Sequence, residues 1–132
     1  MTDACVLDTS AVIAYLRDEP GAERVRSRLR FGYRIMHAVN VAELCFTAPK
    51  RMPERFSPES TMVWFNAMDI AVSGVYDSDF LQLSAEIRLK ERSLSVGDGM
   101  TVALASMLNL PVMTTERNFR KVHEYATIEV IR

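Results

Sequence analysis

The stretch CVLDTSAVIAYL (5–16) puts an acidic residue at the junction between two different apolar patterns. Residues 4–7 form a short, continuous apolar run, which predicts a buried strand, and residues 9–17 predict a short helix. Asp8 stands between them. Burying an unpaired carboxylate among Val, Leu and Ala is costly, so this position requires a compensating group.

Three further acids interrupt apolar stretches in a similar way. Glu43 lies in HAVNVAELCF, Asp98 in LSVGDGMTVALA and Glu116 in PVMTTERNF. Each stands where a predicted strand gives way to a helix or where a predicted helix begins. The chain therefore carries four carboxylates in comparable positions.

Short β-like runs alternate with helical patterns along the chain. The predicted strands are 4–7, 33–39, 70–75, 111–115 and 127–132. The predicted helices are 9–17, 21–31, one from near Asn40 that ends before Pro53, one from Ser57, 78–92, 95–109 and 117–125; segment 47–58, with three prolines, is expected to be a plain connector rather than a flap. This alternation predicts an α/β fold with a mostly parallel five-stranded sheet and helices on both faces.

Composition limits the class of protein. The chain has 132 residues, of which 48% are apolar and 25% charged, and we expect one domain over residues 1–132. A net charge of −1 argues against nucleic-acid binding through general basicity. A local basic cluster is offset by nearby acids and favours a solvated helix face over an RNA track, which remains the alternative: Arg17, Arg24, Arg26, Arg28, Arg30 and Arg34.

Targeting signals and cysteine usage point to the same compartment. The N-terminal residues lack a signal-peptide pattern, and no run is long enough to cross a bilayer. Cys5 and Cys45 have no metal-type spacing and are expected to be reduced packing residues. We therefore expect a cytoplasmic protein without a membrane segment.

In an open parallel sheet, ligands collect beyond the carboxyl ends of the strands, where three or all four acids would converge. Each acid also has a structural interpretation. Asp8 could cap a helix, Asn40-x-x-Glu43 and Ser95-x-x-Asp98 match the capping box, and Glu116 alone would be a loop acid. Jointly, the carboxylates would repel one another without a cation between them. An oxygen-only ligand set suits Mg²⁺ or Mn²⁺.

Polar neighbours border the proposed site. The hydroxyl residues could orient carboxylates or waters, although helix capping and strand-end hydrogen bonds explain them equally well: Thr9, Ser10, Thr114 and Thr115. Asn40 is interpreted first as a helix cap, with a link to Glu43 or substrate as a second role. His37 and His123 lack paired ligand spacing and are taken as structural.

These residues resemble a known family. The order L-D-T-S (7–10), N-x-x-E (40–43), S-x-x-D (95–98) and T-T-E-R-N-F (114–119) is similar to the PIN domain, in particular to VapC-type toxins of prokaryotic toxin–antitoxin pairs. The resemblance implies a metal-dependent endoribonuclease that acts as a homodimer and is silenced by a cognate antitoxin.

Carried over by position, the resemblance makes Asp8, Glu43 and Asp98 the core acids and Glu116 the fourth. The sequence departs from the family at this corner, because the family usually has Asp at the Glu116 position and often another acid where Asn118 stands. Asn118 is therefore only a supporting candidate.

Metal-assisted hydrolysis of RNA predicts products with a 5′-phosphate and a 3′-hydroxyl. Three alternatives remain open: a PIN nuclease for RNA processing without an antitoxin, a phosphatase of the haloacid dehalogenase type, and a catalytically weakened PIN binding module. The phosphatase reaction requires a second acid two residues after Asp8, where this chain has Ser10.

Large apolar residues cluster in 46–68 and are interpreted mainly as core, although they could also form a groove for an antitoxin helix or a second subunit: Phe46, Met52, Phe56, Met62, Trp64, Phe65 and Met68.

Overall fold

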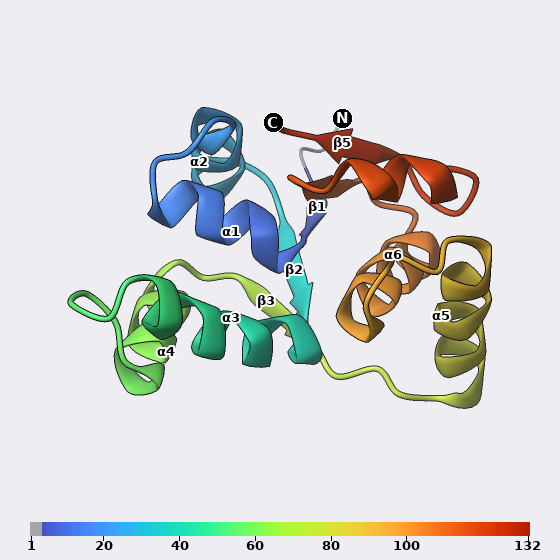
Figure 1. Cartoon of the computed structure of the whole chain (residues 1–132), viewed down its shortest axis with the longest axis horizontal. Helices are drawn as coiled ribbons and strands as arrows, with labels where there is room; N and C mark the ends of the chain where they lie inside the picture. The colour runs from blue at the N-terminus through green and yellow to red at the C-terminus, as the bar shows by residue number, and fades with distance from the viewer. Residues whose placement is uncertain (1–3) are drawn as a thin grey trace.

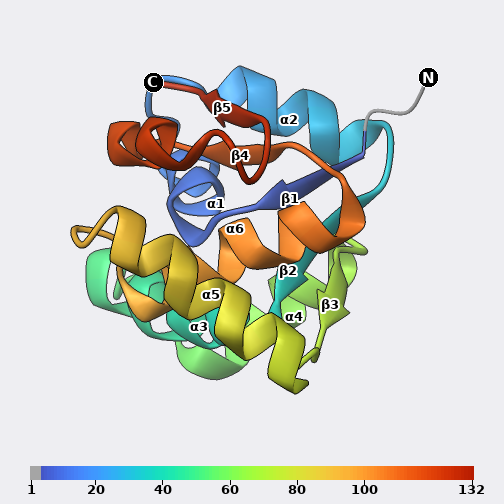
Figure 2. The ribbon, with the colours of Figure 1, turned by 90° about the vertical axis from the view of Figure 1, so that its right-hand side faces the viewer.

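The computed structural model describes residues 4–132, and its centre is a five-stranded parallel sheet. The strands are β1 (Cys5–Leu7), β2 (Arg34–His37), β3 (Ala71–Ser73), β4 (Val112–Thr114) and β5 (Ile128–Val130). Their order is β3-β2-β1-β4-β5, and every neighbouring pair is parallel. Figure 2 shows this order across the sheet, with β5 at the top and β3 at the bottom. The predicted parallel α/β sheet is confirmed.

Helices connect the strands and cover both faces. They are α1 (Thr9–Leu16), α2 (Ala22–Arg30), α3 (Ala38–Arg51), α4 (Pro58–Ala67), α5 (Ser78–Lys90), α6 (Val96–Leu108) and the 3₁₀ helix η1 (Arg117–Val122). Helices α1 to α4 lie on one side of the sheet, and α5 and α6 lie on the other (Figure 1). The chain builds β1, β2 and β3 in one direction and then returns to β4. Because crossovers are right-handed, this reversal moves the helices to the opposite face.

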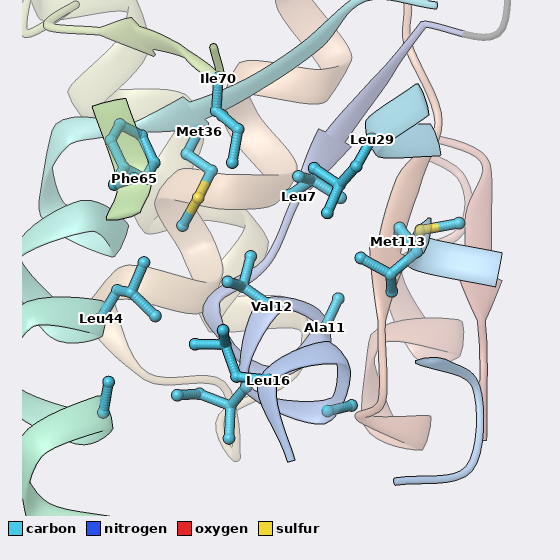
Figure 3. Close-up of a cluster of buried hydrophobic side chains, with 14 of the residues drawn as sticks. Leu7, Ala11, Val12, Leu16, Leu29, Met36, Leu44, Phe65, Ile70 and Met113 are labelled. Carbon is cyan, nitrogen blue, oxygen red and sulfur yellow. The ribbon is translucent and has the colours of Figure 1, made fainter. Parts of the chain in front are cut away.

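The two faces of the sheet bury two separate cores. On the α1–α4 side, Leu7, Met36 and Met113 from the strands meet Leu44 of α3 and Phe65 of α4 (Figure 3). On the α5–α6 side, the core is built from the alternate strand residues and apolar side chains of α5, α6 and η1: Val6, Ile35, Val112, Phe80, Ile87, Leu104, Phe119 and Val122. Continuously apolar strands are what a sheet covered on both faces requires.

Helix α3 ends before Pro53, as predicted, but it begins earlier than predicted and covers part of the predicted connector. It begins at Ala38, with His37 as its N-cap, rather than near Asn40. It also continues through Pro49 to Arg51, so the expected connector at 47–58 is helical in its first part. Proline removes one backbone hydrogen bond, but only in the last turn, and Ala48 and Met52 pack into the core there. Tertiary packing therefore outweighs the proline.

The large apolar residues of 46–68 divide between core and surface. Met52 and Phe65 are buried, and four others are partly buried against the same core: Phe56, Met62, Trp64 and Met68. Phe46, however, is 65% exposed. The core interpretation therefore holds for this group except for Phe46.

The basic cluster and the cysteines are largely explained by packing and pairing. Arg24 and Arg28 both contact Glu129 of β5, which favours the solvated-face interpretation over an RNA track. Cys5 is buried, whereas Cys45 is only half-buried, and both thiols are free. Within residues 4–132, no helix has the length and apolar character needed to span a membrane.

Candidate active site

A cavity of about 330 Å³ opens at the carboxyl edge of the sheet, and all four predicted acids line it. The remaining lining residues are Thr9, Ser10, Ile13, Glu19, Thr47, Arg51, Thr115 and Arg132. Strands β1 and β4 are neighbours at the point where the strand order reverses, and their ends supply Asp8 and Glu116. This switch point is where open α/β sheets bind ligands.

Asp8 is buried at the end of β1, and its side chain does not cap α1. Its backbone N–H donates to Met113 O of β4 at 3.0 Å. Ser10 Oγ and Thr114 Oγ1 donate to Asp8 Oδ2 at 2.7 and 2.9 Å. Burial, followed by the charges of Asp98 and Glu116, raises the pKa of Asp8 to about 7, although the two hydroxyls oppose the shift. The capping interpretation of Asp8 is wrong.

Glu43 lies in the second turn of α3, so it is not part of a capping box with Asn40. Its Oε1 is buried without a hydrogen-bond partner. The carboxylate fits closely against Gly97 of α6, since a Cβ at that position would overlap Oε1 and lie 2.9 Å from Cδ. Burial and the charge of Asp98 raise the pKa of Glu43. An orphaned carboxylate oxygen of this kind requires a proton or a cation.

Asp98 has two roles. Its Oδ2 accepts from the Ser95 N–H at 2.9 Å, and Ser95 Oγ accepts from the Asp98 N–H at 3.1 Å, so the predicted capping box is present. Asp98 also lines the cavity beside the other acids. Burial raises the pKa of Asp98, although hydrogen bonds from Ser95 and the charge of Arg88 oppose the shift.

Glu116 is the most exposed of the four and stands at the cavity rim. Its backbone N–H donates to Thr114 Oγ1 at 3.0 Å, which ties it to the hydroxyl that supports Asp8. Partial desolvation of the carboxylate and the charge of Asp98 raise the pKa of Glu116, and Arg132 opposes the shift. Repulsion from Asp98 thus acts on each of the other three acids.

Asn40 does not cap α3, contrary to the sequence prediction, because His37 Nδ1 accepts the Val39 N–H instead. The buried Asn40 amide donates to Thr101 Oγ1 at 2.6 Å and to Gly97 O at 3.5 Å. Thr9 Oγ1 donates to Asn40 O at 2.9 Å. This buried network joins α1, α3 and α6. Asp8 precedes α1, Glu43 lies in the second turn of α3 and Asp98 lies in the first turn of α6.

The other supporting residues occupy different places. Thr115 lines the cavity, and its N–H donates to Ser10 Oγ at 3.0 Å. Asn118 lies outside the residues that line the cavity; its Nδ2 donates to Ser93 Oγ at 2.9 Å, while its Oδ1 is buried without a partner. His37 is structural, as predicted, since its ring stacks on Phe80 in the core.

Five cavity residues were not predicted as site residues, the apolar Ile13 and four polar ones: Glu19, Thr47, Arg51 and Arg132. No motif in the sequence marks any of the four polar residues. Arg51 lies in the last turn of α3, and only the packing of α3 against the rest of the fold brings it to the cavity.

Comparison with known families decides the classification. The model of the PIN domain matches residues 5–125. The chain belongs to the PIN domain family. This PIN domain is therefore not a haloacid dehalogenase-type phosphatase. Comparison with curated proteins gives no match.

Solved structures similar to this PIN domain share its fold at low sequence identity. VapBC2 from Rickettsia felis, bound to a DNA fragment from its promoter, is 14% identical over 96% of this chain and 97% of that chain, with a TM-score of 0.68. VapBC-1 from nontypeable Haemophilus influenzae is 18% identical over 96% of each chain, with a TM-score of 0.68. VapBC-5 from Mycobacterium tuberculosis, of a toxin–antitoxin family, is 21% identical over 98% of each chain, with a TM-score of 0.58.

The donor set of this PIN domain fits a hard divalent cation. Every predicted ligand is a carboxylate, and Glu43 Oε1 lacks a partner. As they stand, the acids are spread around the cavity: over residues 4–132, no three His, Cys, Asp or Glu side chains are grouped closely enough to hold an ion. Asp98 Oδ2 is bonded to Ser95, and Glu43 is lodged against Gly97. Cation binding therefore requires these side chains to converge.

Proposed function

We propose that this PIN domain is a Mg²⁺- or Mn²⁺-dependent endoribonuclease and the toxin of a type II toxin–antitoxin pair. The observation that carries the proposal is the cavity itself. Carboxylates from four segments of the chain line one hollow, and burial raises the pKa of each. Repulsion from Asp98 adds to the shift of the other three. Perturbed acids gathered in a cleft are typical of a functional site.

Asp8, Glu43 and Asp98 would hold the ion, with Glu116 as a fourth ligand. A bound divalent ion lowers the pKa of a bound water and neutralises charge on a phosphate. The chain itself holds Asp8 in place through Ser10 and Thr114. Such supporting hydrogen bonds fix the orientation of a ligand. The proposed products carry a 5′-phosphate and a 3′-hydroxyl.

Because the chain departs from the family pattern at positions 116 and 118, Glu116 is the one remaining candidate for the fourth metal ligand among these two. Asn118 donates to Ser93 and does not line the cavity, so it is not proposed to contact the ion. Glu116 is exposed at the rim, and its longer side chain can turn towards Asp8 and Asp98. We propose that it completes the ligand set.

The proposed partners are a cognate antitoxin, an RNA substrate and a second copy of the chain, in the cytoplasm. The proposal of an antitoxin is supported by membership in the PIN domain family and by the fold shared with a M. tuberculosis protein of a toxin–antitoxin family. A small adjacent reading frame whose product binds this chain would favour the toxin. Its absence would favour an RNA-processing PIN nuclease.

The test is sequencing of RNA ends after expression of the wild type, of Asp8→Asn, and of Glu129→Gln as a control. Glu129 is an acid on β5 that is paired with Arg24 and Arg28 outside the cavity. New 5′-phosphate ends in the wild type and the control, but not in Asp8→Asn, would support the proposal. Cyclic phosphates, or identical ends in all three, would overturn it.

A metal titration separates the nuclease from the weakened binding module. We expect the wild type to bind Mg²⁺ or Mn²⁺ and Asp98→Asn to bind either ion at least about tenfold more weakly. Equal metal binding by both, together with no RNA cleavage, would favour a binding module.

A further inference from the structure

We propose that Arg51 and Arg132 form a phosphate-binding site at the mouth of the cavity, where they hold the RNA backbone next to the bond that is cut. The inference rests on the proposed nuclease function and adds the groups that position its substrate. It starts from Glu19, a half-buried acid that lines the same cavity as the proposed metal ligands.

Glu19 forms ion pairs with three guanidinium groups. Arg132 Nη2 donates to Glu19 Oε1 at 2.8 Å, Arg17 Nε donates to Oε2 at 2.9 Å, and Arg51 Nη2 lies 3.4 Å from Oε2. Arg17 Nη1 also donates to Arg51 O at 3.4 Å. Although partial burial works against it, the hydrogen bonds and charges of the three arginines keep the pKa of Glu19 below its usual range. Glu19 therefore stays ionised at neutral pH and fixes the cluster.

The cluster retains positive charge. Three arginines around one carboxylate leave a net charge of +2, and one acid cannot neutralise them. A guanidinium group has five N–H donors, of which Glu19 engages only a small part. The side chains of Arg51 and Arg132 are each 43% exposed, so their remaining donors are accessible to a ligand.

The position of the cluster indicates its ligand. Arg51 and Arg132 line the same cavity as Asp8 and Asp98. The positive charge of Arg132 acts to lower the pKa of Glu116. A cavity lined by both carboxylates and arginines suits a phosphodiester chain, with one phosphate beside the proposed metal ligands and a neighbouring phosphate on the guanidinium groups. Planar guanidinium groups bind phosphate oxygens through paired hydrogen bonds.

Structural ion pairing alone does not explain this arrangement. On the α2–β5 surface, Glu129 binds Arg24 and Arg28 and ties α2 to the sheet. The Glu19 cluster instead joins the α1–α2 turn, the last turn of α3 and the end of the chain around a hollow. The comparison predicts that its arginines act on RNA binding more than on folding.

The test compares Arg51→Gln and Arg132→Gln with the wild type, with Arg51→Lys as a charge-retaining variant and Arg30→Gln as a matched control. Arg30 ends α2 just before β2 begins, so it lies at the amino edge of the sheet, opposite the cavity. Binding of a fluorescent single-stranded oligoribonucleotide is measured by anisotropy in chelator over a series of salt concentrations. Cleavage kinetics are measured separately with Mg²⁺.

We expect each Gln variant to weaken binding about three- to tenfold and to reduce the slope of log K against log salt by about 0.7, the value for one lost phosphate contact on a single strand. The loss should be equal for oligouridylate and oligoadenylate, because phosphates carry no sequence. In cleavage, KM should rise while kcat stays within about twofold. Arg51→Lys should restore the salt slope, and Arg30→Gln should match the wild type.

The outcomes separate this inference from the proposed function. Cleavage by the wild type with unchanged affinity, salt slope and KM in both Gln variants would overturn the phosphate site and leave the nuclease standing. Arginine-dependent RNA binding without any cleavage would support the phosphate site and overturn the nuclease. No RNA binding by the wild type in chelator, together with no cleavage in Mg²⁺, would overturn both.

Discussion

The proposed metal ligands of the cavity and Glu129 of the α2–β5 surface are all acids, but of these only Glu129 is paired directly with arginines. At the α2–β5 surface, Glu129 accepts from Arg24 at 2.5 Å and from Arg28 at 3.1 Å. In the cavity, Asp8 is almost fully buried and receives only two hydroxyl hydrogen bonds, while Asp98 and Glu116 repel it. The first arrangement stabilises the fold, and the second stores electrostatic free energy that a cation can release.

The largest expected effect is on RNA cleavage, which should depend on the cavity acids and not on the acid of the α2–β5 surface. Asp98→Asn should lower kcat/KM for RNA by about 10²- to 10³-fold, since losing a group that merely supports a metal ligand already costs 10- to 100-fold. The fold should persist, because the amide oxygen of Asn can still accept from the Ser95 N–H. Glu129→Gln should keep wild-type activity. If Asp98→Asn stayed within about threefold of the wild type, the cavity would not be the catalytic centre.

The pH dependence of stability is the second test. In the metal-free protein, the pKa of Asp8 is raised from 3.8 to about 7, so the folded state holds this proton more tightly than the unfolded chain does. The free energy of unfolding should therefore fall as the pH rises from about 4 to about 7 and level off above, by at most roughly 4 kcal/mol. Asp8→Asn should lose the part of this dependence that comes from Asp8 and be more stable than the wild type at about pH 8. The raised pKa values of Glu43, Asp98 and Glu116 leave a weaker dependence of the same sign.

Urea unfolding in chelator at several pH values measures this effect. Saturating Mg²⁺ should stabilise the wild type at about pH 8 far more than Asp8→Asn, because a ligand stabilises only the state that binds it. Glu129→Gln is the control and should follow the wild-type pH profile. Parallel profiles for the wild type and Asp8→Asn would mean that the Asp8 carboxylate is compensated by groups of the protein itself.

The third prediction concerns a substitution that displaces the Glu43 carboxylate but leaves its charge unchanged. In Gly97→Ala, the new methyl group would occupy the place of Glu43 Oε1, so the flexible carboxylate must shift. Activity should fall about tenfold, while stability changes by less than about 1 kcal/mol, because Ala favours the helix that Gly97 occupies. Gly74→Ala, where a Cβ meets nothing within 4 Å, is the matched control. Unchanged kcat/KM and unchanged metal affinity in Gly97→Ala would show that the position of Glu43 is not critical.

The smallest effect belongs to the compensated surface. Glu129→Gln should lower the free energy of unfolding by no more than about 1 kcal/mol, because ion pairs near the surface contribute little. Thermal unfolding measures this change. A loss of several kcal/mol would mean that the α2–β5 ion pairs stabilise the fold far more than exposed pairs usually do.

Two motifs with the same capping-box spacing show what could and could not be predicted from the sequence. Ser95-x-x-Asp98 forms the capping box that its pattern predicts, because Ser95 is the N-cap of α6. Asn40-x-x-Glu43 has the same spacing but forms none, because the helix begins at Ala38 and His37 is its cap. Nothing in the local sequence announces a histidine cap, so the second prediction failed although Glu43 still reaches the cavity.

The pattern of apolar runs and interrupting acids was enough to predict a parallel α/β sheet and to bring Asp8, Glu43, Asp98 and Glu116 to one edge, because carboxyl ends of parallel strands share an edge. Tertiary structure alone decided which polar groups surround them. The Asn40 network, the unpartnered oxygen of Glu43 and the arginines on Glu19 depend on contacts between segments far apart in the chain. Such contacts follow from how the helices pack, and local periodicity carries no record of them.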